Sequence, residues 1–123
     1  SFATTPESAT IALKSFQQPI VMLAGGAEKN SNFKELAKTI NKKVKFLVLF
    51  SGDATLRLKR EVERSGFNKN KIKIAKSMQE AVAIARRNAE TGEVVLMSPA
   101  CASFGMFRNY KERGKLFKQV VKN

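Results

Sequence analysis

The residues best suited to holding a charged ligand lie in two loops that follow apolar runs. In the first loop, Gly25 and Gly26 come directly after the apolar run 19–24, and Lys29 follows them. A lysine in a short loop at the end of a strand can offer its ammonium group to a carboxylate, which is a strong charge-assisted contact. The alternative of a solvated surface lysine stays open, because lysines in basic segments usually face water.

The second loop has the sequence Ser-Pro-Ala-Cys-Ala-Ser-Phe over residues 98–104, after the apolar run 94–97. An apolar run that breaks at Ser-Pro is typical of a buried strand that ends in a loop. Small residues there let hydroxyl and backbone N–H groups face a ligand, although Ser103 could equally be an ordinary turn hydroxyl. We interpret Cys101 as a small buried hydrophobe rather than a nucleophile, because no base is available to activate it.

The residue types that the sequence lacks narrow its chemistry. There is no histidine, which removes Ser–His and Cys–His nucleophile pairs and the commonest metal ligand. The 10 acidic residues form no calcium-loop pattern, and the sequence has neither a P-loop nor a complete G-x-G-x-x-G fingerprint. We therefore predict no catalytic residue, no metal site and no cofactor bound by this chain alone.

The charge is strongly positive, with 23 Lys and Arg residues against 10 Asp and Glu and a formal net charge of +13. Such a balance raises the alternative of a basic module that binds nucleic acid or an anionic membrane surface. The lysines are dispersed over several segments and no RNP-like aromatic motif accompanies them, so we expect solvated faces and neither kind of partner. Salt-dependent binding of RNA or DNA would favour the alternative.

The length of 123 residues predicts one domain with one compact core. No apolar run approaches the roughly 18 residues of a membrane span. The first residues lack the basic start and apolar centre of a signal peptide, and the single cysteine cannot form an internal disulfide. These features together predict a cytoplasmic protein, which we expect to be a monomer.

Around the two loops, short apolar runs alternate with segments of helical periodicity. Strands are expected at residues 19–24, 44–50, 72–75 and 93–97. Helices are expected at residues 5–16, from 31 or 32 to about 40, at 53–66, 77–91 and 109–121.

Polar residues at the starts of these helices are expected to cap them. Thr5 precedes Pro6, Asp53 precedes the third helix, and Ser77 forms a capping box with Glu80. The cap of the second helix is expected at Ser31 or Asn32. In the first helix we expect Ile11, Ala12 and Phe16 to face the core. In the third, we expect an inward face of four apolar side chains: Leu56, Leu58, Val62 and Phe67.

The alternation of strands and helices predicts an α/β, Rossmann-like three-layer domain. Its sheet should be mainly parallel, with helices on both faces and right-handed crossovers. Ligands in such sheets bind beyond the carboxyl ends of the strands, where the strand order reverses. Because the loops richest in Gly, Ser and Ala follow the first and fourth strands, we place these strands side by side, in the order 3-2-1-4. The two loops should then meet at one edge of the sheet.

The second loop and the residues after it resemble a known family. Residues 98–104, with the Phe-Arg-Asn-Tyr-Lys-Glu-Arg-Gly run of residues 107–114, closely resemble the C-terminal motif of the Mur ligases that add D-glutamate. The Gly-Gly-x-x-Lys pattern of residues 25–29 resembles the same family, and the resemblance extends over nearly the whole chain. It implies that residues 1–123 are the D-glutamate acceptor domain, truncated at its N-terminus, and that the UDP-binding and ATPase domains are absent from the chain.

The resemblance also implies roles for particular residues. Lys29 should hold the incoming D-glutamate, and Thr4, in the family's Lys-Ala-Thr-Asn pattern, should contact it too. Ser103 and the backbone of Phe104 should approach the side-chain carboxylate of D-glutamate, with Tyr110 close by. Each of these residues has an ordinary structural interpretation as well, such as a turn or helix-cap hydroxyl for Thr4.

The chain departs from the family pattern at several positions. Phe2 stands where the family usually has lysine, Thr5 replaces asparagine, and Tyr110 replaces phenylalanine and adds a hydroxyl. These departures remove the contact expected from a lysine at position 2 and alter the surroundings expected around Tyr110.

For the whole enzyme, the resemblance implies a reaction that uses ATP and Mg²⁺. An acyl-phosphate forms on the L-alanine carboxyl of UDP-N-acetylmuramoyl-L-alanine, and the amine of D-glutamate attacks it to give an amide, ADP and phosphate. The ligation reaction would require the central ATPase domain of the enzyme to close against this domain. The chain alone is therefore expected to be inactive, with D-glutamate as its own ligand.

Overall fold

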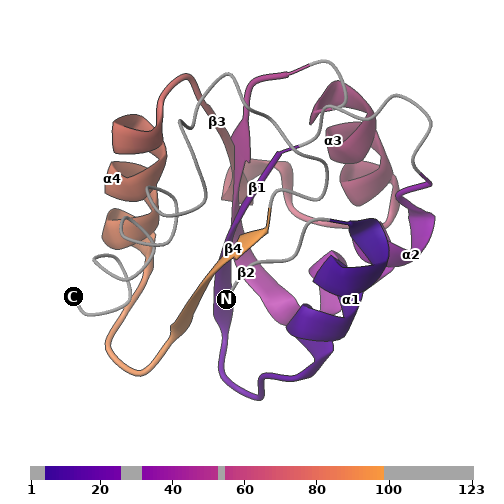
Figure 1. The fold of residues 1–123 in the computed structure, drawn as a ribbon, viewed down its shortest axis with the longest axis horizontal. Coiled ribbons are helices and arrows are strands. Elements are labelled where there is room, and N and C mark those ends of the chain that lie inside the picture. Colours follow the sequence, from indigo (N-terminus) through magenta and orange to yellow (C-terminus); the bar gives the residue numbers. More distant parts are fainter. Residues whose placement is uncertain (1–4, 26–31, 53–54, 99–123) are drawn as a thin grey trace.

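A computed structural model describes residues 5–25, 32–52 and 55–98 of the chain, in which helices cover both faces of a parallel four-stranded sheet (Figure 1). The strands are β1 (Ile20–Ala24), β2 (Val44–Phe50), β3 (Ile72–Ala75) and β4 (Val94–Ser98). The helices are α1 (Pro6–Lys14), α2 (Lys34–Lys43), α3 (Thr55–Arg64) and α4 (Met78–Asn88), with a short 3₁₀ turn, η1 (Lys69–Lys71), before β3. The predicted helix at 109–121 lies outside the described residues.

The strand order is β3-β2-β1-β4, as the sequence predicts. All three neighbouring pairs are parallel, and Ala24 at the end of β1 lies opposite Leu49 of β2 and Ser98 of β4. The chain moves outward from β1 through β2 to β3 and then returns through α4 to β4 on the other side of β1. The order therefore reverses between β1 and β4, which is where the carboxyl edge of such a sheet usually binds ligands.

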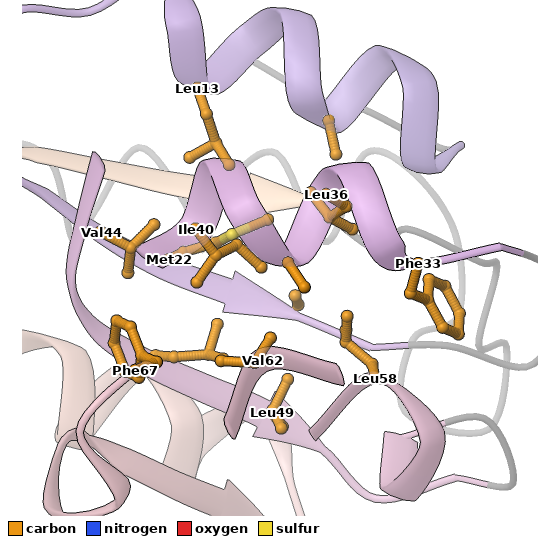
Figure 2. Close-up of a cluster of buried hydrophobic side chains, with 14 of the residues drawn as sticks. Leu13, Met22, Phe33, Leu36, Ile40, Val44, Leu49, Leu58, Val62 and Phe67 are labelled. Atoms are coloured by element: carbon orange, nitrogen blue, oxygen red, sulfur yellow. The ribbon is translucent and has the colours of Figure 1, made fainter. Parts of the chain in front are cut away.

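Helices α1, α2 and α3 cover one face of the sheet, and their apolar side chains form the larger core cluster. Figure 2 shows this cluster, in which Leu13 of α1 and Leu36 and Ile40 of α2 pack with Leu58 and Val62 of α3. All five side chains are fully buried. Burying a Leu, Ile or Val side chain contributes about 1.5–3 kcal/mol, so this face supplies much of the stability that holds the strand ends in place.

Helix α4 covers the opposite face alone among the described helices (Figure 1). Its Met78 and Ala85 pack with Val21, Leu23 and Val48 of the two central strands. Because β1 and β2 are buried on both sides, they contain almost only apolar residues, as is typical of parallel sheets between helix layers. The described residues thus form the three layers that the sequence predicts.

The predicted helix caps are confirmed at Thr5 and Ser77, whereas the predicted cap Asp53 lies outside the described residues. The Thr5 hydroxyl accepts a hydrogen bond from the Ser8 N–H at 3.0 Å, and the Ser8 hydroxyl accepts one from the Thr5 N–H at 3.0 Å. The side-chain oxygen of Ser77 accepts from the Glu80 N–H at 3.1 Å, which is the serine half of the predicted capping box. These bonds satisfy backbone donors that a helix start leaves without partners.

The predicted core positions Ile11 and Leu56 are wrong, because both side chains are exposed, by 70% and 55%. In α1 the buried stripe contains Ala9 and Leu13. In α3 it contains Leu58 and Val62, one turn later. A helix turns by about 100° per residue, so a residue two positions from the buried stripe points to the opposite side. In α1 the error lies in the phase of the helix, whereas in α3 the predicted Leu58, Val62 and Phe67 are buried and only Leu56 is misplaced.

Candidate functional site

The carboxyl ends of β1 and β4 form the edge at which the sequence places the site. Ala24 and Ser98 are register partners there, so the loop that contains the Gly-Gly pair and the loop that begins at Pro99 leave the sheet from adjacent positions. The predicted meeting of the two loops remains a prediction beyond these starting points, because residues 26–31 and 99–123 lie outside the described residues.

All five predicted D-glutamate contacts, Thr4, Lys29, Ser103, Phe104 and Tyr110, lie outside the described residues, and so does Cys101. The structure therefore describes the frame from which these residues extend. That frame consists of the strand ends, the first glycine after β1, and the starts of α1, α2 and α3.

The first glycine of the Gly-Gly pair lies against an aromatic ring. Gly25 is buried, and a Cβ atom added to it would lie 3.1 Å from both Cβ and Cδ2 of Phe50. Phe50 is itself fully buried at the end of β2. The ring thus occupies the space that a side chain at position 25 would need, and glycine lets the backbone leaving β1 pass directly over it. The sequence analysis identified the glycine but not this neighbour.

The end of β2, which carries Phe50, is held by hydrogen bonds to two other elements. The hydroxyl of Thr55, the first residue of α3, donates to the Phe50 carbonyl. The Ser51 N–H donates to the Ala75 carbonyl at 3.1 Å, and the Thr55 N–H donates to the Gly52 carbonyl at 3.1 Å. Thr55 is only 2% exposed, and it is a supporting residue that the sequence analysis missed. Its signal was a threonine at a helix start a few residues after a buried strand.

The start of α1 lies at the same end of the domain as the start of α2. Pro6 and Asn32 line one cavity of about 220 Å³ between these two helices. The capping bonds between Thr5 and Ser8 fix the chain immediately after Thr4. Thr5, which replaces the family's asparagine, thus has a clear structural role as the helix cap.

The start of α2 follows residues 26–31, and its N-cap is Phe33, which makes no side-chain capping hydrogen bond. The prediction of a cap at Asn32 is therefore wrong by one residue, although the Asn32 side-chain oxygen accepts a hydrogen bond from the Lys34 N–H at 3.0 Å. Ser31, the other predicted cap, lies outside the described residues. Phe33 is buried in the core below. Phe33 therefore attaches the start of α2 to the core.

The carboxylates among the described residues do not form a metal site. No group of three or more His, Cys, Asp or Glu residues among the described residues could hold a metal ion. Glu93 pairs with Lys45 at 2.6 Å, and this hydrogen bond lowers the pKa of the Glu93 carboxyl. The pair joins the segment before β4 to β2, at the amino end of the sheet, opposite the predicted site. We interpret it as structural.

The class of protein follows from this geometry: a three-layer α/β domain whose strand order reverses beside two small-residue loops. A model of the family described as Mur ligase, glutamate ligase domain, matches residues 1–101. The chain belongs to this family. No helix among the described residues has the length and apolar character to cross a membrane.

Curated relatives show which ligases of this family the chain is similar to. The chain is 44% identical over 98% of its length to a UDP-N-acetylmuramoylalanine–D-glutamate ligase of Pelotomaculum thermopropionicum, and 40% identical over its whole length to one of Clostridium tetani. It spans 26% and 27% of those two proteins, so it is similar to about a quarter of each.

Among solved structures, one similar chain is a domain ascribed to a UDP-N-acetylmuramate:L-alanyl-gamma-D-glutamyl-meso-diaminopimelate ligase of Haemophilus ducreyi. The TM-score is 0.61, and the match covers 98% of this chain and 87% of that one. At 15% sequence identity this likeness concerns the fold alone. It agrees with the three-layer architecture described above.

Proposed function

We propose that this chain is the domain of a peptidoglycan-precursor ligase that binds D-glutamate and presents it for addition to UDP-N-acetylmuramoyl-L-alanine. The observation that carries the proposal is the similarity, over essentially the whole chain, to relatives named as D-glutamate ligases. The geometry supports it, because two loops that carry the family's motif residues leave the sheet at adjacent strand ends.

In this proposal the chain's own residues bind and orient the amino acid. Lys29 pairs with a carboxylate of D-glutamate, and Thr4 contacts the same molecule from the segment before α1. Ser103 and the backbone of Phe104 bind the side-chain carboxylate, with Tyr110 beside them. Holding the amine in a fixed position relative to the activated carboxyl group contributes to the rate by removing the entropy cost of the encounter.

ATP and Mg²⁺, which the family resemblance implies, do not fit the residues that the structure describes. The sequence has no P-loop, and the described residues contain no cluster of three or more candidate metal ligands. We therefore assign the activation of the L-alanine carboxyl to other parts of the longer ligase, and no step of it to this chain.

The proposal is tested by replacing Lys29 with alanine in the full-length ligase. A hydrogen bond to a charged group contributes roughly 1.5–3 kcal/mol. At about 1.4 kcal/mol per factor of ten, the apparent constant for D-glutamate should rise roughly ten- to a hundred-fold or more, with a much smaller change for ATP. The matched control is Lys42→Ala, which removes an exposed lysine near the end of α2 and should change neither constant.

Steady-state kinetics with one substrate varied at a time separates the outcomes. An unchanged D-glutamate dependence would mean that Lys29 is a solvated loop lysine and that the family role does not apply to it. An equal loss for ATP and D-glutamate would indicate a general effect on the fold. No ligation by the unmodified full-length protein would refute the proposed function itself.

A further inference from the structure

The first turn of α3 follows the end of β2 and lies beside the start of α2. A hollow of about 430 Å³ opens between these two helices, and its lining includes Asn32, Phe33 and Arg57. The helices pack against each other on one face of the sheet (Figure 1). The start of α3 therefore adjoins the point at which residues 26–31 lead into α2.

One residue of this turn contacts the start of α2 through an aromatic ring. The guanidinium group of Arg57 lies 5.4 Å from the centroid of the Phe33 ring, within the usual range of a cation–π contact. Phe33 is the N-cap of α2 and is only 2% exposed, and Figure 2 shows its ring at the start of that helix. Because a cation–π contact is stronger when its partners are shielded from water, this contact holds the start of α2 against α3.

A second residue of the same turn acts on the end of β1. The buried hydroxyl of Thr55 donates to the Phe50 carbonyl. The ring of Phe50 lies against Gly25, where an added Cβ would be 3.1 Å from its Cδ2 atom. Thr55 thus supports the residue before the segment 26–31, whereas Arg57 supports the residues after it.

The spacing of Thr55 and Arg57 makes α3 a common support for both ends of this segment. The two residues are two positions apart on one helix, so the rise between them is about 3 Å along its axis. A single helical turn holds them at a constant separation. The two ends of the segment 26–31 are therefore held relative to each other, which reduces the number of conformations that the segment can adopt.

We propose that Arg57 is a positioning residue for the binding of D-glutamate, with Thr55 as its counterpart at the other end of the segment. This role rests on the proposed function, in which Lys29 of the same segment pairs with a carboxylate of D-glutamate. Loss of either contact would leave the protein folded but lower the fraction of molecules whose segment is arranged for binding. The apparent affinity for D-glutamate falls in proportion to that fraction.

A positioning role and a purely structural role predict different kinetics. A lower competent fraction raises the apparent constant for D-glutamate, whereas saturating D-glutamate restores the competent arrangement and most of kcat. The constant for ATP should not change, because ATP binding is assigned to other parts of the longer ligase. A purely structural contact would lower the thermal stability of the ligase and leave both constants as they are.

The test is steady-state kinetics of the full-length ligase, with thermal denaturation alongside. Arg57→Met removes the charge but keeps a long side chain, and it should raise the D-glutamate constant roughly three- to thirty-fold. Arg57→Lys keeps a cation and should recover part of this loss. The matched control is Arg60→Met, the same replacement at an exposed position about one turn later on α3. It should leave the constant unchanged within about two-fold.

A double-mutant cycle with Phe33→Leu separates the contact between Arg57 and Phe33 from any other contacts of the two residues. Leucine keeps an apolar side chain in the core but has no aromatic face for the guanidinium group. Arg57→Met should therefore raise the D-glutamate constant less in the Phe33→Leu background than in the unmodified ligase.

The other end of the segment is tested at Thr55. Thr55→Val removes the hydroxyl at nearly the same volume and should raise the D-glutamate constant roughly two- to ten-fold, whereas Thr55→Ser keeps the hydroxyl and should not. The matched control is Thr39→Val, which removes another buried hydroxyl, one that donates to the Glu35 carbonyl within α2 at 3.0 Å. It should leave the D-glutamate constant unchanged.

Three results would overturn the positioning role and leave the proposed function intact. The first is an unchanged D-glutamate constant in Arg57→Met, with or without a loss of stability. The second is an equal effect of Arg57→Met in the two backgrounds of position 33. The third is a parallel rise of the constants for ATP and D-glutamate. If the unmodified ligase showed no saturable dependence on D-glutamate, the proposed function itself would fail, and the role of Arg57 with it.

Discussion

Replacing Gly25 by alanine tests how the strand frame positions the loop after β1. The added Cβ would lie 3.1 Å from two atoms of the buried Phe50 ring and side-chain root, closer than ordinary van der Waals contact. One of them, the Phe50 Cβ, cannot rotate away, because the end of β2 is held by Thr55 and Ala75. The backbone leaving β1 is therefore the part that must move.

The size of the effect can be worked out from packing. An extra methyl group in a packed site costs about 1–3 kcal/mol. This strain is relieved when the loop shifts, and it must be paid again when D-glutamate draws the loop back to its binding position. At about 1.4 kcal/mol per factor of ten, the D-glutamate constant should rise by a factor of roughly 5 to 140.

The assay is steady-state kinetics of the full-length ligase, with thermal denaturation alongside. Gly92→Ala is the control: its φ of +88° makes alanine strained there, yet nothing lies within 4 Å of the added Cβ, and the turn lies before β4. That variant should lose stability but keep its D-glutamate constant. The combination of Gly25→Ala with Phe50→Leu should show partial coupling, since leucine removes the ring contact but keeps the contact with the Cβ. An identical effect of Gly25→Ala in both backgrounds would refute the role of the ring.

Four further outcomes are expected. The chain alone should release no phosphate from ATP, and turnover that survives repeated purification would contradict this. The full-length protein should not bind oligonucleotides at physiological salt; micromolar binding lost on mutating one compact lysine group would show otherwise. Thr5→Ala should cost about 1 kcal/mol of stability in a denaturation experiment, whereas Thr5→Ser should retain the cap. Finally, the hydrogen bond from Lys45 lowers the pKa of Glu93 below its ordinary value of 4.5. The stability that this pair contributes should therefore be complete above pH 4.5 and be lost as the pH falls through the lowered pKa. Glu93→Gln should abolish this part of the pH dependence of stability, and an unchanged pH profile in that variant would refute the role of the pair.

The strand order could be predicted from the sequence because the argument needs only local signals. Apolar runs mark the strands, and the small-residue loops after the first and fourth runs indicate which strands are neighbours. Helix phase is harder to predict. The apolar residues of α1 surround the helix, so Ile11 was a reasonable core residue until tertiary packing selected Ala9 and Leu13. Packing against α2 and the sheet determines which stripe is buried, and the periodicity of α1 alone does not show it.

Part of the candidate site could likewise be predicted from the sequence, and part could be seen only in the structure. Lys29 and Ser103 were identified by their similarity to a family motif, and their roles remain predictions because they lie outside the described residues. The contact between Gly25 and Phe50 joins the residue after β1 to the last residue of β2, and no local pattern indicates it. Sequence similarity thus supports the proposed ligand, while the structure supplies the physical reason for the first glycine.

The basic residues show most clearly where sequence reasoning ends. Because they are dispersed along the chain, the sequence analysis interpreted them as solvated faces. Lys34 and Lys38 are separated from Arg57, Arg60 and Arg64 by a whole strand, yet parallel crossovers place α2 and α3 side by side on one face of the sheet. Charges that are dispersed in sequence can therefore gather in space, and what they bind must be argued from the surface that they share.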